Sequence, residues 1–261
     1  MAGGIVTLLT DFGLSDHYVG VLKGVILRFN PSAQIVDLTH QVEPFDVLGA
    51  SFTLAAAHSY FPPGTVHAVV VDPGVGGDRR PILAEAGGWL FLAPDNGVLE
   101  WIYRRRPARV RALQPDRFAL QPISNTFQGR DIFAPAAGLL SGGESPERLG
   151  DPIEDFARLD LPCPRQVAPG RWQGEVLKVD RFGNLITNFT AAELPARFWL
   201  TVGQARVEKL HAAYSSAPPG AIFAIAGSSG FIEISVKEAS AAAAAGAGPG
   251  APVAVQFLGD G

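Results

Sequence analysis

The stretch of sequence that decides the fold is Val69-Val70-Val71-Asp72-Pro73-Gly74-Val75-Gly76-Gly77-Asp78-Arg79-Arg80. Its valines predict a buried strand, because β-branched residues favour an extended backbone. The strand ends at an acid, a proline and glycines, which allow a sharp turn and a close approach of the backbone to a ligand. Taken alone, Asp72-Pro73-Gly74 is more often an ordinary turn at the end of a strand, so its meaning depends on the rest of the chain.

Strands and helices alternate on the N-terminal side of this stretch. Residues 5–9 and 34–38 have the pattern of buried strands, and apolar residues recur at helical spacing in residues 17–29 and 47–61. This alternation predicts a parallel or mixed sheet with helices on both faces. After the stretch, residues 82–93 predict a hairpin that turns at Gly87-Gly88.

The pattern changes in the last third of the chain, where short strands are separated by turn residues. Their spacing predicts a small, all-β, antiparallel barrel or sandwich. We therefore expect an α/β domain over residues 1–160, a Pro-rich linker over 161–170 and a barrel-like β domain over 171–261. Residues 240–249 are rich in Ala and Gly, and we expect a surface insertion there, as a poorly ordered helix or loop.

Composition limits the classes of function. The chain has 261 residues, 47% of them hydrophobic, and a formal charge of −4, so we expect a globular protein without general affinity for nucleic acid or anionic membranes. It has no apolar run of membrane-spanning length and no secretion signal, which predicts a cytoplasmic protein. The single cysteine excludes an internal disulfide, and the five histidines show no metal-ligand spacing, so we expect no metal.

Polar side chains follow three segments of the predicted α/β domain. They are Asp11 and Asp16, then Asp72 and Arg79, then Gln128 and Arg130. If these segments meet at one edge of the sheet, that edge is the site. Carboxylates beside an arginine suit a cationic or hydroxyl-rich ligand and the orientation of a water molecule. The sequence lacks a nucleophile elbow, a P-loop and a complete dinucleotide fingerprint.

Seven motifs follow one another along the chain. They are Thr10-Asp11-Phe12-Gly13, Glu43-Pro44-Phe45-Asp46, Val71-Asp72-Pro73-Gly74-Val75-Gly76, Ala93-Pro94-Asp95-Asn96-Gly97, Thr126-Phe127-Gln128-Gly129-Arg130-Asp131, Asp180-Arg181-Phe182-Gly183-Asn184 and Gly227-Ser228-Ser229-Gly230. In this order they resemble the S-adenosylmethionine (SAM) hydroxide adenosyltransferases, the SAM hydrolases related to the bacterial fluorinase and chlorinase. The resemblance covers nearly the whole chain.

This resemblance implies hydrolysis of SAM at the ribose C5′ carbon to adenosine and methionine, with SAM as substrate and without a metal or cofactor. It also implies a homotrimer, with each site between the N-terminal domain of one subunit and the C-terminal domain of the next. The family handles its water with an Asp, an Arg and a His. Asp72 and Arg79 match the first two, but Gln128 replaces the histidine. Glutamine can hold a water molecule, but it cannot take up a proton near neutral pH.

The resemblance implies further roles, each with an ordinary structural alternative as a cap, turn or core residue. Asp11 would bind the ribose hydroxyls, Phe45 would pack on the sugar and Phe127 would contact the substrate. Asp16 and Asp180 would face the methionine ammonium, Ser228 and Ser229 its carboxylate, and Asn184 and Tyr214 the adenine.

Three functions are compatible with these residues. The first is SAM hydrolysis with Gln128 in the third position, and the second is non-catalytic binding of adenosine or SAM. The third, a halide-using synthase like the fluorinase, is disfavoured, because Asp72 and Arg79 match the water-using pattern and a carboxylate repels a halide.

Overall fold

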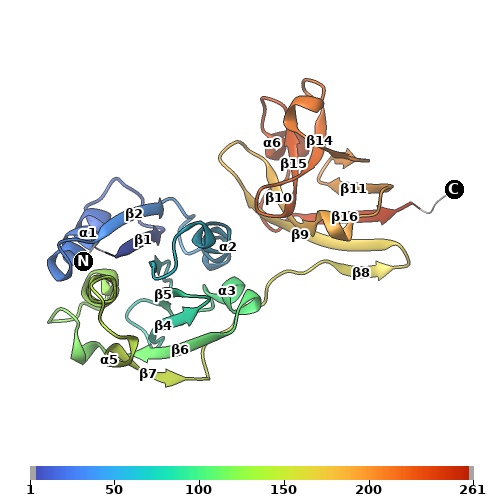
Figure 1. The fold of residues 1–261 in the computed structure, drawn as a ribbon. Helices are drawn as coiled ribbons and strands as arrows, with labels where there is room; N and C mark the ends of the chain where they lie inside the picture. The colour runs from blue at the N-terminus through green and yellow to red at the C-terminus, as the bar shows by residue number, and fades with distance from the viewer. Residues whose placement is uncertain (1–3, 259–261) are drawn as a thin grey trace. The chain divides into compact units, whose positions relative to one another are not determined.

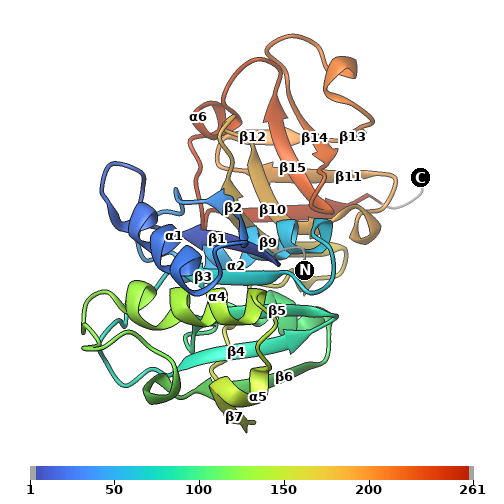
Figure 2. The ribbon, with the colours of Figure 1, turned by 60° about the vertical axis from the view of Figure 1, so that its left-hand side comes forward.

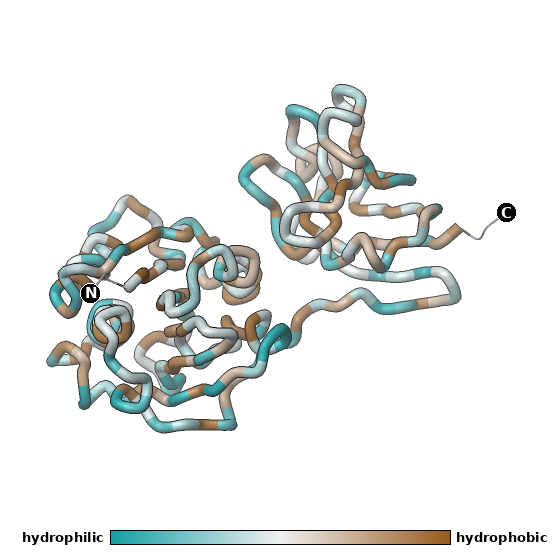
Figure 3. The backbone as a smooth tube through the Cα atoms, viewed as in Figure 1, coloured by the Kyte–Doolittle hydropathy of each residue, from teal (hydrophilic) through white to brown (hydrophobic). Residues whose placement is uncertain are grey.

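The computed structural model describes residues 4–258. The chain separates into two compact units, the first ending at Leu161 and the second beginning at Pro162 (Figure 1). Hydrophobic and hydrophilic segments alternate along the backbone within both units (Figure 3). None of the helices formed by residues 4–258 has the length and apolarity needed to cross a membrane.

The first unit contains a seven-stranded sheet in the order β2-β1-β3-β5-β4-β6-β7. Neighbours from β2 to β5 pair in parallel, whereas β4, β6 and β7 join in antiparallel fashion, which confirms the predicted mixed sheet. The strands are β1 (Ile5–Thr10), β2 (Gln34–Thr39), β3 (Val66–Val70), β4 (Pro81–Ala86), β5 (Trp89–Pro94), β6 (Ala108–Leu113) and β7 (Gly150–Ile153).

Strand β3 lies between β1 and β5, and all five of its residues are buried. Successive side chains of a strand point to opposite faces, so β3 contributes to two hydrophobic cores. Ala68 and Val70 belong to the core on one face of the sheet, while Val69 belongs to the core on the other face. The central valines therefore fix both layers of the unit.

Helices cover both faces of this sheet. α1 (Tyr18–Phe29) and α4 (Ala134–Ser141) pack together over one face (Figure 2), while α2 (Val47–Ala57) and α3 (Glu100–Arg105) contact each other over the other. The remaining helical segments are η1 (His58–Tyr60), η2 (Pro115–Arg117), the π-helical turn η3 (Gly129–Phe133) and α5 (Pro146–Leu149).

The predicted hairpin of β4 and β5 is confirmed. Ala86 pairs with Trp89, so Gly87 and Gly88 form a two-residue turn. Their φ angles of 60° and 91° lie in the left-handed region that this kind of turn requires.

The second unit is built mainly of strands, which form a curled sheet in the order β12-β11-β16-β9-β10-β15-β14-β13, with β8 also pairing with β9. All pairs are antiparallel except β13 with β14. The strands are β8 (Arg165–Ala168), β9 (Arg171–Val179), β10 (Leu185–Thr190), β11 (Phe198–Val202), β12 (Ala205–Val207), β13 (Leu210–His211), β14 (Ile222–Ala226), β15 (Phe231–Val236) and β16 (Pro252–Phe257), and the 3-10 turns are η4 (Ala191–Glu193) and η5 (Tyr214–Ser216).

Two expectations for this unit need correction. Strand β8 lies inside the segment predicted as a linker, and it pairs along one side of β9. The Ala-rich segment contains helix α6 (Ala241–Ala245), whose first and last residues are completely buried in the core. Ser240 caps this helix by accepting the N–H of Ala243 at 3.2 Å. Composition suggested a surface insertion, but the small side chains let the helix pack closely.

Candidate active site

Asp72 and Arg79 form a buried ion pair in the loop that leaves β3. The Arg79 Nε lies 3.0 and 2.9 Å from the two carboxylate oxygens of Asp72, and Nη2 donates to Oδ2 as well. The side chains are only 6% and 10% exposed, respectively. The planar guanidinium and this forked contact orient the carboxylate while they balance its charge.

Asp72 lies in a pocket of about 260 Å³, hereafter the first pocket, at the carboxyl ends of β1 and β3. The pocket is formed by four segments that are far apart in the sequence. Five of the lining residues were predicted from the sequence as site residues. The lining is Asp11, Phe12, Pro44, Phe45, Val70, Asp72, Val75, Thr126, Phe127, Gln128 and Gly129.

Phe45 and Asp11 are joined across this pocket. The backbone N–H of Phe45 donates to Oδ2 of Asp11 at 2.9 Å. Phe45 has a φ of 69°, a conformation that a side chain with a Cβ disfavours, and its side chain is 69% exposed. The next residue, Asp46, caps α2 by accepting the N–H of Gly49 at 2.8 Å. The start of α2 thus holds a strained aromatic residue at the pocket.

Gln128 lies immediately before the π-helical turn η3. Its Oε1 is buried and has no hydrogen-bond partner within residues 4–258. Asp131 fixes the turn, because its carboxylate accepts both the Arg130 guanidinium, at 2.6 and 2.9 Å, and the N–H of Ser124, at 2.8 Å. A buried acceptor without a partner is costly, so the Gln128 oxygen is suited to a water molecule or a ligand donor.

A second pocket, of about 650 Å³, lies in the C-terminal unit. Four sequence-predicted residues line it, namely Asp180, Asn184, Tyr214 and Ser228. The full lining is Asp180, Phe182, Asn184, Tyr214, Ser228, Glu233, Val236, Glu238, Ala239 and Ser240. No lysine or arginine belongs to this lining, so its three carboxylates give the second pocket a negative field.

Asp180 shapes the chain in this pocket. Its Oδ1 accepts the backbone N–H groups of Phe182 and Asn184, both at 2.9 Å, and Oδ2 accepts the Asn184 amide at 2.8 Å. The ordinary turn role of Asp180 is therefore present, while its carboxylate also lines the pocket.

Glu233 on β15 is a pocket residue that the sequence reasoning missed. It is 8% exposed, and its Oε2 accepts the Tyr214 hydroxyl at 2.9 Å. Burial and this hydrogen bond raise the pKa of Tyr214. Gly227 packs so closely on the same carboxylate that a Cβ there would lie 1.9 Å from Oε1. The available signal was a single acid between Ile232 and Ile234 in a mainly apolar strand.

The two pockets share one backbone feature. Within residues 4–258, only two residues other than glycine have a positive φ, Phe45 at 69° and Glu238 at 61°. Each lines one of the pockets. Such strain concentrates at functional sites, because ordinary positions have no reason to retain it.

Three predicted residues do not line either pocket. Asp16 is exposed, and Arg79 reaches the first pocket through Asp72. Ser229 follows the pocket residue Ser228, and its Oγ is buried with no hydrogen-bond partner in the described part of the chain. Residues 4–258 contain no group of three His, Cys, Asp or Glu side chains that could hold a metal ion.

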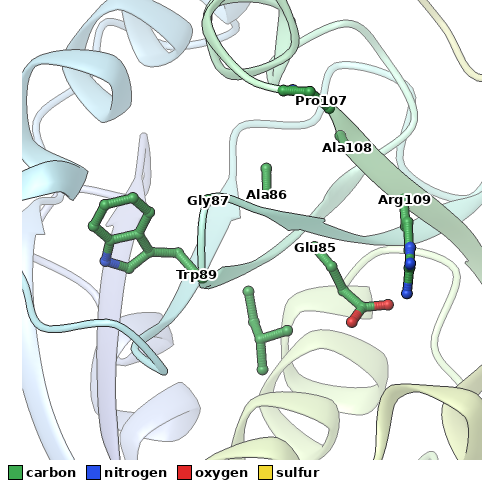
Figure 4. Close-up of a pocket in the computed structure, with 9 residues that line it drawn as sticks. Glu85, Ala86, Gly87, Trp89, Pro107, Ala108 and Arg109 are labelled. Atoms are coloured by element: carbon green, nitrogen blue, oxygen red, sulfur yellow. The ribbon is translucent and has the colours of Figure 1, made fainter.

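A further hollow of about 380 Å³ lies at the β4–β5 hairpin (Figure 4). Glu85 and Arg109 pair across β4 and β6 at its edge, and the Trp89 ring is covered by the Arg106 guanidinium, whose carbon lies 4.9 Å from the ring centroid. None of the predicted site residues lines this hollow.

Both units are similar to domains of one known protein family. The profile of the SAM hydroxide adenosyltransferase N-terminal domain matches residues 6–150, and that of the C-terminal domain matches residues 174–254. The chain is 42% identical to the (R)-S-adenosyl-L-methionine hydrolase of Thermus thermophilus, over 95% of this chain and 98% of that protein. It is 25% identical to a fluorinase of Actinoplanes sp., over 73% of each chain.

Solved structures agree in fold. The crystal structure of an uncharacterized conserved protein from Thermotoga maritima superposes with a TM-score of 0.90 at 37% identity, covering 97% of this chain and all of that one. The crystal structure of a conserved hypothetical protein from Thermus thermophilus superposes with a TM-score of 0.78 at 38% identity, covering 98% of this chain and all of that one.

Proposed function

Because the chain belongs to the SAM hydroxide adenosyltransferase family, we propose that it hydrolyses S-adenosyl-L-methionine to adenosine and L-methionine. The observation that carries the proposal is the 42% identity, across almost the whole of both chains, to a protein named as a SAM hydrolase. The buried pair of Asp72 and Arg79, whose carboxylate lines the first pocket, supports it, since a water-using site needs an oriented acceptor.

The proposed reaction requires one water molecule in line with the C5′–S bond. The water oxygen forms a bond to C5′, and the C5′–S electron pair stays on sulfur, which leaves as the neutral thioether of methionine. The sulfonium is already a good leaving group, so nothing must protonate it. Asp72 orients the water and accepts its proton, while Arg79 fixes Asp72 and stabilises the developing hydroxide. The mostly apolar first pocket limits competing water.

Gln128 holds the attacking water in this proposal. Its Oε1 is buried and has no hydrogen-bond partner among residues 4–258, which supports this assignment. Since an amide does not titrate near neutral pH, Asp72 is the proton acceptor among the three proposed catalytic residues.

The remaining residues bind the substrate. In the first pocket Asp11 receives the ribose hydroxyls, Phe45 packs on the sugar and Phe127 adds an apolar wall. Asn184 and Tyr214 take the adenine, while Asp16, Asp180, Ser228 and Ser229 take the methionine end. We propose a homotrimer whose sites combine the N-terminal domain of one subunit with the C-terminal domain of the next. Phe45 at 69% exposure and Phe182 at 78% are apolar surfaces that such an assembly would cover.

Incubation with SAM in ¹⁸O-labelled water tests this function. Adenosine that carries the label, formed together with methionine and detected by mass spectrometry, is the expected result. Unlabelled adenosine would exclude water attack at C5′. Formation of a 5′-halo-adenosine that depends on added halide would instead indicate a synthase like the fluorinases.

Gln128 favours a second candidate function, non-catalytic binding of adenosine or SAM. Calorimetry that finds tight binding without turnover would support it. If the protein is a hydrolase slowed at this position, Gln128→His should raise kcat by about tenfold, because imidazole can also accept a proton. Loss of turnover in that variant would show that the water is held in a different way.

A further inference from the structure

The loop of Asp72 and Arg79 is held at both ends by one turn. We call residues 71–80 the Asp72 loop and residues Asp95-Asn96-Gly97, directly after β5, the Asp-Asn turn. At the start of the loop, the Asn96 amide donates to the carbonyl of Val71 at 3.0 Å. At its end, the N–H of Asp95 donates to the carbonyl of Arg80 at 2.8 Å. The turn therefore fixes the residues directly before Asp72 and directly after Arg79.

A side-chain contact strengthens the second tether. Oδ2 of Asp95 accepts Nε and Nη2 of Arg80 at 3.0 and 2.8 Å. The Asp95 side chain is 5% exposed, whereas Arg80 also pairs at 2.9 Å with Asp155, which is 81% exposed. The hydrogen bonds to Arg80 raise its pKa, with Asp155 contributing most and Asp95 next. The backbone carbonyl of Asp155 also accepts Nη2 of Arg80, at 2.7 Å. The ion pair with the Asp155 side chain lies in water, where screening leaves it little energy, so Asp95 is the stronger of the two charged partners.

The Asp-Asn turn is itself firmly held. Oδ1 of Asp95 accepts the N–H of Ala157 at 2.7 Å, and Oδ1 of Asn96 accepts the N–H of Val98 at 3.1 Å. Gly97 has a φ of 88°, and a Cβ there would lie 2.9 Å from that of Leu159. Only glycine combines that φ with this close packing, so the turn has little freedom.

Between the tethers, the loop is restrained by the fork between its own residues Arg79 and Asp72 and by two backbone hydrogen bonds. Inside it, the N–H of Val75 donates to the Asp72 carbonyl at 3.3 Å and that of Gly77 to the Gly74 carbonyl at 3.0 Å. The three glycines give the backbone many accessible conformations. Because Arg79 belongs to the same loop, its fork with Asp72 moves with the loop. The position of the Asp72 carboxylate therefore depends on the two ends, where the Asp-Asn turn acts.

We propose that Asp95 and Asn96 are positioning residues for hydrolysis, a role that rests on the proposed function. Neither lines the first pocket. Asn96 acts through the carbonyl of Val71, and Asp95 acts through the carbonyl and the guanidinium of Arg80. A displacement of about 1 Å at a reacting group can lower the rate by about a hundredfold. Loosening either tether should thus slow the chemical step without removing a contact to the substrate.

Two isosteric substitutions loosen one tether each. Asn96→Asp replaces the donor to Val71 with an acceptor but keeps the oxygen that accepts from Val98. Asp95→Asn places an amide donor against the Arg80 guanidinium but keeps the oxygen that accepts from Ala157. Asp155→Asn is the matched control, because it removes the negative charge of the exposed side-chain partner of the same arginine and keeps the backbone carbonyl that accepts Arg80 Nη2.

The experiment compares kcat and KM for SAM, calorimetric affinity and stoichiometry for adenosine, and hydrogen exchange in residues 71–80. Asp95→Asn and Asn96→Asp should each lower kcat by about 10- to 100-fold, with KM, adenosine affinity and stoichiometry within about twofold of the unmodified protein. Exchange in the Asp72 loop should become faster. The Asp155→Asn variant should match the unmodified protein in every measurement.

Unchanged kcat in both variants would overturn the proposal. A parallel loss of kcat and adenosine stoichiometry would also overturn it, because the turn would then support the fold in general. If the unmodified protein releases no adenosine from SAM, the proposed function fails on its own. Hydrogen exchange still decides whether the turn restrains the loop, and unchanged exchange would refute that restraint.

Discussion

In the first pocket, the negative charge of Asp72 is balanced by Arg79, whereas the acids of the second pocket have no lysine or arginine among the residues that line it. Asp72 is bound in a fork by Arg79, and both side chains are at most 10% exposed. Asp180, Glu233 and Glu238 share a pocket with no lysine or arginine among its lining residues. A paired carboxylate is oriented but attracts other charges weakly, while unpaired carboxylates attract a cation. This difference suits the first pocket to chemistry and the second to binding of a positively charged substrate.

Asp72→Asn tests this division most strongly. The amide cannot accept the water's proton and loses the charged contact with Arg79, so kcat should fall by about a thousandfold. Adenosine affinity, measured by calorimetry, should change little. Asp78→Asn is the control, because Asp78 is an exposed acid in the same loop. Full turnover in Asp72→Asn would exclude Asp72 as the proton acceptor. It would also refute the division of chemistry to the first pocket and binding to the second.

Acid should destabilise the first unit, which carries the first pocket, more than the second unit. His67 in the first unit is completely buried against Thr7 and Phe91, and burial lowers its pKa from 6.5 to about 3, with the neighbouring His58 also contributing. Below pH 6.5 the unfolded chain takes up a proton on His67, whereas the folded chain does so only near pH 3. The free energy of unfolding therefore decreases as the pH falls from 6.5 to about 3. At pH 5 the loss from this residue should be about 2 kcal/mol.

Urea unfolding at two pH values measures this effect. His67→Gln should lose about 2 kcal/mol less stability than the unmodified protein between pH 7.5 and pH 5. His211→Gln in the second unit is the control, since His211 is only partly buried there. Equal losses in all three proteins would mean that His67 is not the source of acid sensitivity.

Loss of the Glu233 contact should affect binding in the second pocket. We expect Glu233→Gln and Tyr214→Phe each to raise KM for SAM by about tenfold, with kcat within about twofold, because their hydrogen bond holds a proposed adenine-binding ring. In the double variant, the rise in KM expressed as a free energy should be smaller than the sum of the rises in the two single variants. Glu208→Gln, at an exposed acid of the same unit, is the control. A fall in kcat with unchanged KM would contradict the separation of binding from chemistry.

Periodicity predicted most of the fold from sequence because its signals are local. The valines of β3, the helical repeat of α1 and the glycine pair of the β4–β5 hairpin each depend on neighbouring residues. Helix α6 was missed because a run of alanines has the same composition on a surface and in a close-packed core. Strand β8 was missed because its partner, β9, and not its own pattern, makes it extended.

The motifs predicted much of the candidate site, whereas partners that meet only through the fold were missed. Asp11, Asp72 and Gln128 were recognisable because each belongs to a motif, and the structure brings them into one pocket. Glu233 lies in a mainly apolar strand, and its partner Tyr214 is 19 positions away. No local pattern joins two such residues, since the contact forms only where the turn η5 meets strand β15.

Backbone strain gives the smallest expected effect and compares the two pockets directly. A left-handed residue with a Cβ costs about 1 kcal/mol or more relative to glycine, so Phe45→Gly should be more stable to urea than Phe45→Ala by about that amount. Both variants remove the same ring, which is largely exposed, so their difference isolates the backbone. Glu238→Gly and Glu238→Ala should differ in the same direction in the second pocket. If the alanine variant is the more stable at either position, that backbone is not strained, and strain does not mark that pocket as functional.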